Sequence, residues 1–264
     1  MNRSLRVVMF AACAFQAFFA AAFALQWPIA LEIWPLPYTN QMSFIFIGSI
    51  FAAAAVSTFW CVAAREYGAL AGIAVDYLAI FTPMGIFAFQ LASRSSGALA
   101  SKQWLFAVAC LIGVIAGAVM LWWSRRIPIR DTRSVPKVIR VTFIVLVIAL
   151  IGAGGLLTTM QPNILPWTIT GAGSVVYGWI FFGAAAYFAY SVVRPHWGDS
   201  IGQLLGFLAY DLVLIIPFVN LFPTIKPELR FSLYFYTGVV VFTMLLSIAY
   251  VFINPRTHIV RQAS

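Results

Sequence analysis

Apolar residues fall along this chain in eight long, continuous runs that short polar segments separate. A helix of about 20 apolar residues spans the ~30 Å hydrocarbon core of a bilayer. Strands of a membrane barrel would instead alternate polar and apolar residues over about ten positions. We therefore predict an all-α membrane bundle of eight transmembrane helices, near Leu5–Leu25, Ser43–Ala64, Ala69–Ala92, Gln103–Trp123, Val138–Thr158, Ala172–Val193, Ile201–Phe222 and Phe231–Ile253.

The number of helices depends on the separation of the second and third runs and on the retention of the first helix. The second and third runs are separated by the short segment Arg65-Glu66-Tyr67-Gly68. A charged pair is costly at the centre of a membrane, so we predict a tight turn rather than one very long helix. The first run has no clear small-residue cleavage site after it, which favours a retained helix over a cleaved signal peptide.

The composition supports a lipid environment for most of the surface. Apolar residues make up 63% of the chain and charged residues 9%, with a mean hydropathy of +0.96. Soluble domains have about 25% charged residues, so these charges are too few to cover a water-exposed surface. The formal net charge is +9. Because the basic residues lie mostly at the ends of apolar runs, they indicate topology and lipid-headgroup contact rather than nucleic-acid binding.

The basic residues also predict the orientation. With the N-terminus inside, twelve lie on the inner side and four on the outer side, which predicts two cytoplasmic termini in the plasma (inner) membrane. The outer loops are rich in aromatic residues and proline, as in Trp27-Pro28 and Pro166-Trp167, and we expect them along the outer membrane surface. The inner set is Arg3, Arg6, Arg65, Arg125, Arg126, Arg130, Arg133, Lys137, Arg140, Arg194, Arg256 and Arg261; the outer set is Arg94, Lys102, Lys226 and Arg230.

Several landmarks occur twice in the same order, which indicates an internal duplication. Leu36-Pro37-Tyr38-Thr39 recurs as Leu165-Pro166-Trp167-Thr168, and each motif leads into a Gly- and Ala-rich helix. The helix after that one carries Gly72, Asp76-Tyr77 and Pro83 in the first half, and Gly206, Tyr210-Asp211 and Pro217 in the second.

The duplication predicts two four-helix units, residues 1–124 and 138–264, joined by a basic cytoplasmic linker, residues 125–137. Four helices return the chain to the side where it started. The two units should therefore be parallel and related by an axis along the membrane normal. We expect the charges of the linker to be solvated.

Asp76 and Asp211 are the acidic residues that lie well inside apolar runs, at depths of ~10 Å and ~15 Å from the cytoplasmic side. Because a carboxylate at such depth is costly, both should face the bundle interior. Each lies beside a tyrosine and shortly before a proline, and interruptions in corresponding helices of two repeats indicate a transport site. The candidate transport or binding site is Asp76, Tyr77, Pro83, Tyr210, Asp211 and Pro217.

A structural role is the alternative for these acids. A buried aspartate can form one interhelical hydrogen bond and hold two helices together. The order of the pairs is reversed between the halves, so the two carboxyl groups need not occupy equivalent positions. On an ideal helix each tyrosine points about 100° away from its aspartate, and we expect it to contact a neighbouring helix.

Sequence motifs for catalysis are absent. The chain has no Walker A loop, G-x-S-x-G, H-E-x-x-H or Cys-x-x-Cys motif, and its two histidines, His196 and His258, lie in cytoplasmic segments. We therefore expect no enzymatic activity, no cofactor and no metal. An enzyme acting on a lipid would need a polar cluster at the membrane surface, for which Glu66, His196 and Asp199 are the local residues.

The sequence favours a small permease or channel. Few polar side chains lie inside the membrane, which favours a proton-coupled or largely apolar solute over a hydrated ion or a sugar. The alternative is a non-catalytic accessory subunit or membrane scaffold. The partners that we expect are membrane lipids and, for the alternative, other membrane protein subunits, but not nucleic acid.

The orientation can be tested by cysteine labelling in intact cells. We expect cysteines introduced at Ser134 and at Ser264 to resist a membrane-impermeant maleimide until the membrane is permeabilised, because both positions are predicted to be cytoplasmic. Labelling of both positions from outside intact cells would contradict the predicted orientation.

Overall fold

The computed structural model describes residues 3–37, 39–169 and 171–259, and within these ranges it is helical with no strand. Tyr38 of the first repeated motif, Arg261 of the basic set and Ser264 lie outside the described residues. The α-helices are α1 (Arg3–Ala24), α2 (Pro28–Ile33), α3 (Gln41–Ala63), α4 (Leu70–Arg94), α5 (Gly97–Ser124), α6 (Lys137–Thr158), α7 (Gly171–Val193), α8 (Trp197–Leu221) and α9 (Arg230–Ile248). Shorter helical turns are η1 (Tyr67–Ala69), η2 (Pro227–Leu229) and η3 (Ala249–Ile253).

Among the described residues, eight helices are long and apolar enough to cross a membrane, which confirms the predicted set. Two of them begin four or more residues earlier than predicted: α5 begins at Gly97 rather than Gln103, and α8 at Trp197 rather than Ile201. An apolar run marks the part of a helix that is apolar enough to lie inside a membrane, whereas the helix itself continues through polar residues. Asp199 in the first turn of α8 fits this position because a helix N-terminus favours negative charge.

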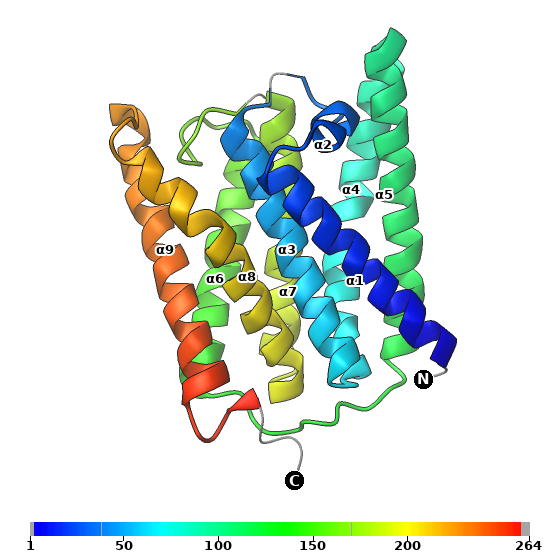
Figure 1. Cartoon of the computed structure of the whole chain (residues 1–264), viewed down its shortest axis with the longest axis vertical. Helices are drawn as coiled ribbons and strands as arrows, with labels where there is room; N and C mark the ends of the chain where they lie inside the picture. The colour runs from blue at the N-terminus through cyan, green and yellow to red at the C-terminus, as the bar shows by residue number, and fades with distance from the viewer. Residues whose placement is uncertain (1–2, 38, 170, 260–264) are drawn as a thin grey trace.

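Helices α3 and α7 form the centre of the bundle, and more than half of each is buried (Figure 1). Helix α1 packs on α3 and α6 packs on α7, while α4 pairs with α5 and α8 with α9. Two further contacts join these pairs, α3 with α8 and α4 with α7. In Figure 1 the pair α4 and α5 lies on the right, and α6 and α9 lie on the left.

Glycines allow the central helices to approach their neighbours closely. A Cβ atom at Gly48 of α3 would lie 2.7 Å from the backbone nitrogen of Ala24 in α1. A Cβ atom at Gly178 of α7 would lie 2.6 Å from Cγ2 of Thr158 in α6. Small residues at such crossings allow the backbone-to-backbone packing that holds membrane helices together.

The two ends of the bundle differ in character. We call the end that carries the start of α1 and residues 125–136 the basic end, and the end that carries α2 the aromatic end (Figure 1). At the aromatic end the second repeated motif contacts the start of α3: Asn40 Nδ2 donates to the carbonyl of Thr168 at 2.6 Å, and Trp167 Nε1 donates to Ser43 Oγ at 3.0 Å. The second motif therefore joins α3 to the segment that precedes α7.

The predicted turn between the second and third runs is confirmed, and it anchors the linker. Arg65 adopts a φ of 60°, and Glu66 is almost fully buried. Its Oε1 accepts hydrogen bonds from the backbone amides of Arg130 at 2.5 Å and Asp131 at 3.3 Å. Burial raises the pKa of Glu66 above its ordinary value, and the two amide hydrogen bonds partly offset this effect.

The expectation that the linker charges are solvated is wrong for Asp131, which is buried and forms an ion pair with Arg133 at 2.6 Å. The reason lies in the adjacent helix end. The first amide groups of a helix lack partners within it, and here the Trp197 and Gly198 amides of α8 donate to the Arg133 and Asp131 carbonyls at 2.7 and 3.0 Å. The linker therefore caps α8 and is held against the bundle.

Removing the Glu66 carboxyl should release the linker. We expect Glu66→Ala to lower the free energy of unfolding by about 1–3 kcal/mol, because two linker amides lose their acceptor. Glu66→Gln keeps the Oε1 acceptor and should change the stability much less. The measurement is the thermal unfolding midpoint of the purified protein in detergent, and equal losses in both variants would contradict this role.

A comparison of the unmodified protein with its Glu66→Gln variant tests the raised pKa of Glu66. A raised pKa means that the folded protein binds this proton more tightly than the unfolded chain does. The contribution of Glu66 to stability should therefore fall as pH rises from the ordinary value of 4.5 through the raised pKa. The stability difference between the protein and its Glu66→Gln variant should show this fall, and a rise over the same interval would contradict it.

Candidate functional site

Asp76 and Asp211 lie in different surroundings. Asp211 in α8 is fully buried, and its Oδ2 accepts a hydrogen bond from the Thr243 hydroxyl of α9 at 2.9 Å. Its Oδ1 atom has no hydrogen-bond partner. This contact joins α8 to α9, which is the structural role considered for an intramembrane aspartate.

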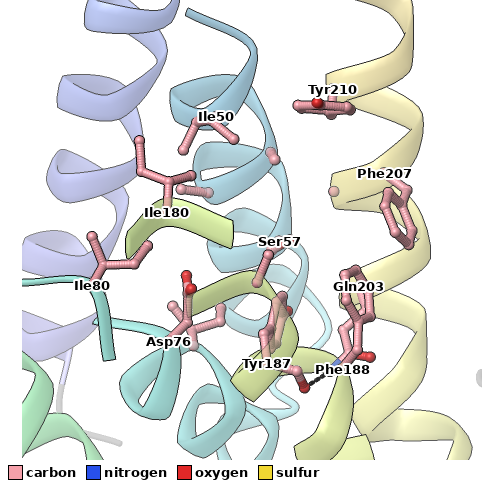
Figure 2. Close-up of a pocket in the computed structure, with 15 residues that line it drawn as sticks. Ile50, Ser57, Asp76, Ile80, Ile180, Tyr187, Phe188, Gln203, Phe207 and Tyr210 are labelled. Atoms are coloured by element: carbon pink, nitrogen blue, oxygen red, sulfur yellow. Dashed lines mark hydrogen bonds between the residues drawn. The ribbon is translucent and has the colours of Figure 1, made fainter. Parts of the chain in front are cut away.

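Asp76 in α4 lines two adjoining cavities of about 120 and about 130 Å³. Within the part of the chain that the structure describes, its carboxyl group has no hydrogen-bond partner. Figure 2 shows this carboxyl directed between Ile80 and Ile180. Both cavities are lined by Asp76 together with Ile50, Ala54, Ile80 and Ile180.

We call the cavity of about 120 Å³ the central cavity; α3, α4, α7 and α8 supply its walls. Its other polar residues are Ser57, Tyr187, Gln203 and Tyr210. Ser57 Oγ donates to the carbonyl of Gly202 at 2.8 Å. Gln203 Nε2 donates to the carbonyl of Tyr187 at 2.6 Å (Figure 2). The Oε1 atom of Gln203 is buried and has no partner. The remaining walls are apolar or aromatic.

The second cavity extends from Asp76 toward α1 and α5. Gln16 of α1 and Tyr77 of α4 line it, and the Gln16 amide donates to the Tyr77 hydroxyl. Tyr210 of α8 likewise forms a hydrogen bond with Tyr236 of α9. Each tyrosine therefore contacts a neighbouring helix, as expected, rather than the aspartate beside it.

Gly183 of α7 has no side chain and so leaves room for the Asp76 carboxyl. A Cβ atom at Gly183 of α7 would overlap Ile80 and would lie 2.6 Å from Oδ1 of Asp76. Gly183 thus sets how closely α4 and α7 approach at the cavity.

The structure brings some of the predicted site residues together and separates others. Asp76 and Tyr210 line the central cavity, and Tyr77 lines the second. Asp211, Pro83 and Pro217 line neither of these two cavities; the prolines lie inside α4 and α8.

Four cavity residues were not predicted from the sequence: Ser57, Tyr187, Gln203 and Gln16. Gln203 carried a detectable signal, because a glutamine in an apolar run needs a partner for its amide. That signal does not identify a cavity, because the lining comes from four helices whose contacts the sequence pattern does not specify.

A second polar group lies at the basic end. His196 Nδ1 lies 3.5 Å from Oδ2 of Asp199, and the Glu66 carboxyl binds the linker amides nearby. Over the described residues no group of three or more His, Cys, Asp or Glu side chains is placed to hold a metal ion. The cysteines Cys13, Cys61 and Cys110 are buried and form no disulfide.

The eight apolar helices are consistent with a multi-pass integral membrane protein. Four of them line the central cavity, where the Asp76 carboxyl has no hydrogen-bond partner among the described residues. No family model, no curated protein and no solved structure matches the chain.

The close approach at Gly183 can be tested with matched alanine substitutions. We expect Gly183→Ala to lower the free energy of unfolding by about 1–3 kcal/mol, because the new methyl group overlaps Ile80 and the Asp76 carboxyl. Gly152→Ala in α6 is the control, because a Cβ atom there meets nothing within 4 Å. Thermal unfolding in detergent should show an unchanged or raised midpoint for the control and a lowered midpoint for Gly183→Ala.

Proposed function

We propose that this chain is a small proton-coupled permease of the plasma membrane, with both termini in the cytoplasm and Asp76 as the group that carries the proton. The observation behind this proposal is the Asp76 carboxyl, which lines two cavities and has no hydrogen-bond partner among the described residues. The solute is small and largely apolar, because the cavity walls are mostly apolar.

Asp211 provides the comparison that supports a functional role for Asp76. An aspartate at the centre of a membrane helix costs about 2.5–3.5 kcal/mol by insertion scales. Asp211 offsets part of this cost through its hydrogen bond with Thr243 and is fully packed. Asp76 has no such bond and borders empty space instead. Packing therefore does not account for an acid at position 76.

We also propose that the bundle is a parallel duplication of two four-helix units, residues 1–124 and 138–264. The helix contacts support it: α1 on α3 corresponds to α6 on α7, and α4 with α5 corresponds to α8 with α9. Across the units, α3 packs on α8 as α7 packs on α4. A twofold axis along the membrane normal would relate each of these contacts to its counterpart.

This duplication accounts for the reversed order of the two acidic pairs. Aligning Gly72 with Gly206 and Pro83 with Pro217 places Asp76 opposite Tyr210, and Tyr77 opposite Asp211. Asp76 and Tyr210 both line the central cavity. Tyr77 faces Gly117 of α5, and Asp211 binds Thr243 of α9. The proposed site thus has one central acid rather than a symmetric pair.

In such a bundle, transport follows from movement of one unit against the other around the cavity. Pro83 and Pro217 lie inside α4 and α8, beyond the acids toward the aromatic end. A proline leaves a carbonyl one turn earlier without its helical partner, so a helix bends there more readily. Both helices could therefore bend without disturbing the polar residues of the site.

A second function, as an accessory subunit or scaffold, has support from an apolar groove of about 550 Å³ between α4 and α5. Exposed side chains such as Ile86, Phe89 and Trp104 line it. A lipid chain or the helix of another membrane protein would fit such a groove. In this function Asp76 would carry no proton.

Proton movement in vesicles tests the permease. The purified protein is reconstituted into liposomes that contain a pH-sensitive dye, and small cationic, neutral and anionic solutes of up to about six non-hydrogen atoms are added. We expect at least one solute to cause proton movement beyond that of protein-free liposomes. Asp76→Asn should abolish this signal, because asparagine keeps the size of the side chain and loses the titration.

Asp211→Asn is the matched control, since Asp211 lines neither cavity and asparagine keeps an acceptor for Thr243. It should retain the signal. Two results would contradict proton coupling through Asp76. One is proton movement that persists in folded Asp76→Asn, and the other is the absence of proton movement with every solute in the unmodified protein.

A further inference from the structure

The atoms that remain without partners in the central cavity indicate which solute it accepts. We propose that the cavity binds a small primary ammonium cation with an apolar body, with the ammonium group against the Asp76 carboxyl. This proposal rests on the proposed function and names the substrate class of the same site.

The charge of the cavity favours a cation. An ionised aspartate is a pure hydrogen-bond acceptor, and no basic side chain lines either cavity among the described residues. An anionic solute would be repelled, and a neutral solute would leave the carboxylate uncompensated in a low-dielectric site. An ammonium group supplies both the opposite charge and three N–H donors.

A second unpartnered acceptor lies on the opposite wall. Gln203 is 1% exposed, and its Oε1 atom has no partner, whereas its Nε2 atom already donates to Tyr187. Figure 2 shows Asp76 on the α4 side of the cavity and Gln203 on the α8 side. Among the described residues, Asp76 and Gln203 thus each carry an acceptor that receives no hydrogen bond, and an ammonium group in the cavity supplies donors to the Asp76 carboxyl.

The size and the walls define the body of the ligand. An apolar cavity of about 150 Å³ holds a benzene molecule, so the central cavity of about 120 Å³ accepts a body somewhat smaller than benzene. The aromatic side chains of Tyr187, Phe188, Phe207 and Tyr210 line it. Aromatic faces attract cations as well as apolar groups, so a short alkylammonium ion suits these walls.

Binding of the cation displaces the proton. The ammonium ion binds the ionised carboxylate, so a carboxyl group that carries a proton must first release it to water, and the carboxylate takes up a proton again after the ammonium ion leaves. Proton and cation compete for one carboxyl, so each cation that crosses in one direction is matched by a proton in the other.

The other titratable side chains around Asp76 do not compete with it near neutral pH. They are Tyr77 on α4, Tyr187 on α7 and Tyr210 on α8, while α1, α3 and α5 contribute none to the cavity walls. Cys13 of α1 lies near Tyr77. Tyrosine and cysteine are ordinarily neutral below about pH 8. The pH dependence of binding between pH 5 and 8 should therefore come from Asp76.

The test is direct binding to the purified full-length protein in detergent, by calorimetry. The probe is n-butylammonium chloride, and the matched probes are butan-1-ol and sodium butyrate, which keep the four-carbon body and change the charge. We expect butylammonium to bind at least about 10-fold more tightly than either. Its affinity should fall as the pH is lowered from 8 to 5, because protonation of the carboxyl removes the charge that holds the cation.

Variants assign the binding to Asp76. Asp76→Asn should weaken butylammonium binding by about 10- to 100-fold, which is the effect of losing a charged hydrogen-bond partner. Asp211→Asn should change it by less than about 2-fold. If Asp76→Asn does not fold, the affinity of the unmodified protein for butylammonium between pH 8 and pH 5 still tests the proposal, because this measurement needs no variant.

Several results would overturn the inference: absence of butylammonium binding to the folded protein, equal or tighter binding of butanol or butyrate, or affinity that does not fall toward pH 5. Cation binding without proton movement in liposomes would leave the cation site in place and contradict the permease. Proton movement driven by a neutral solute, without cation binding, would support the permease and contradict the cation site.

Discussion

The arrangement of the bundle depends on close helix approach at a few small residues in its centre. Membrane helices associate through van der Waals packing and hydrogen bonds, because lipid tails are as apolar as the helix faces and leave no hydrophobic driving force for association. Gly183 of α7 receives Ile80 and Asp76 of α4, and Gly206 of α8 lies against Ser57 of α3, with its Cβ position 3.2 Å from the Ala53 carbonyl. The central cavity lies between these two crossings, so they hold its walls in place.

These crossings give the two intramembrane acids different surroundings. Successive residues of a helix point about 100° apart, so exchanging the order of an aspartate and a tyrosine sends the carboxyl to another face. In α4 this places Asp76 at the cavity, and in α8 it places Asp211 against Thr243 of α9. The same residue type therefore has an unsatisfied carboxyl in one helix and a packed, hydrogen-bonded one in the other.

The helices could be predicted from the sequence because a long apolar run is a local property, and the turn at Arg65 and Glu66 could be predicted because charge is costly inside a membrane. The cavity could not, since Gln203, Tyr187 and Ser57 meet Asp76 only through contacts between distant helices. The binding of the linker was missed for a similar reason. The linker binds the first amides of α8 and the Glu66 carboxyl. These groups come together only because α3 packs on α8.

The hydrogen bonds at the two ends indicate which end would open first in the proposed exchange. At the basic end the linker binds Glu66 and caps α8, and Trp197 Nε1 donates to the carbonyl of Thr257 at 3.0 Å. Opening there would expose a buried carboxyl and unpair several amides at once. At the aromatic end two side-chain hydrogen bonds, those from Asn40 and Trp167, join α3 to the segment that precedes α7. Fewer hydrogen bonds would break at the aromatic end, and the one from Asn40 is already exposed to solvent, so in the proposed exchange we expect the aromatic end to open first.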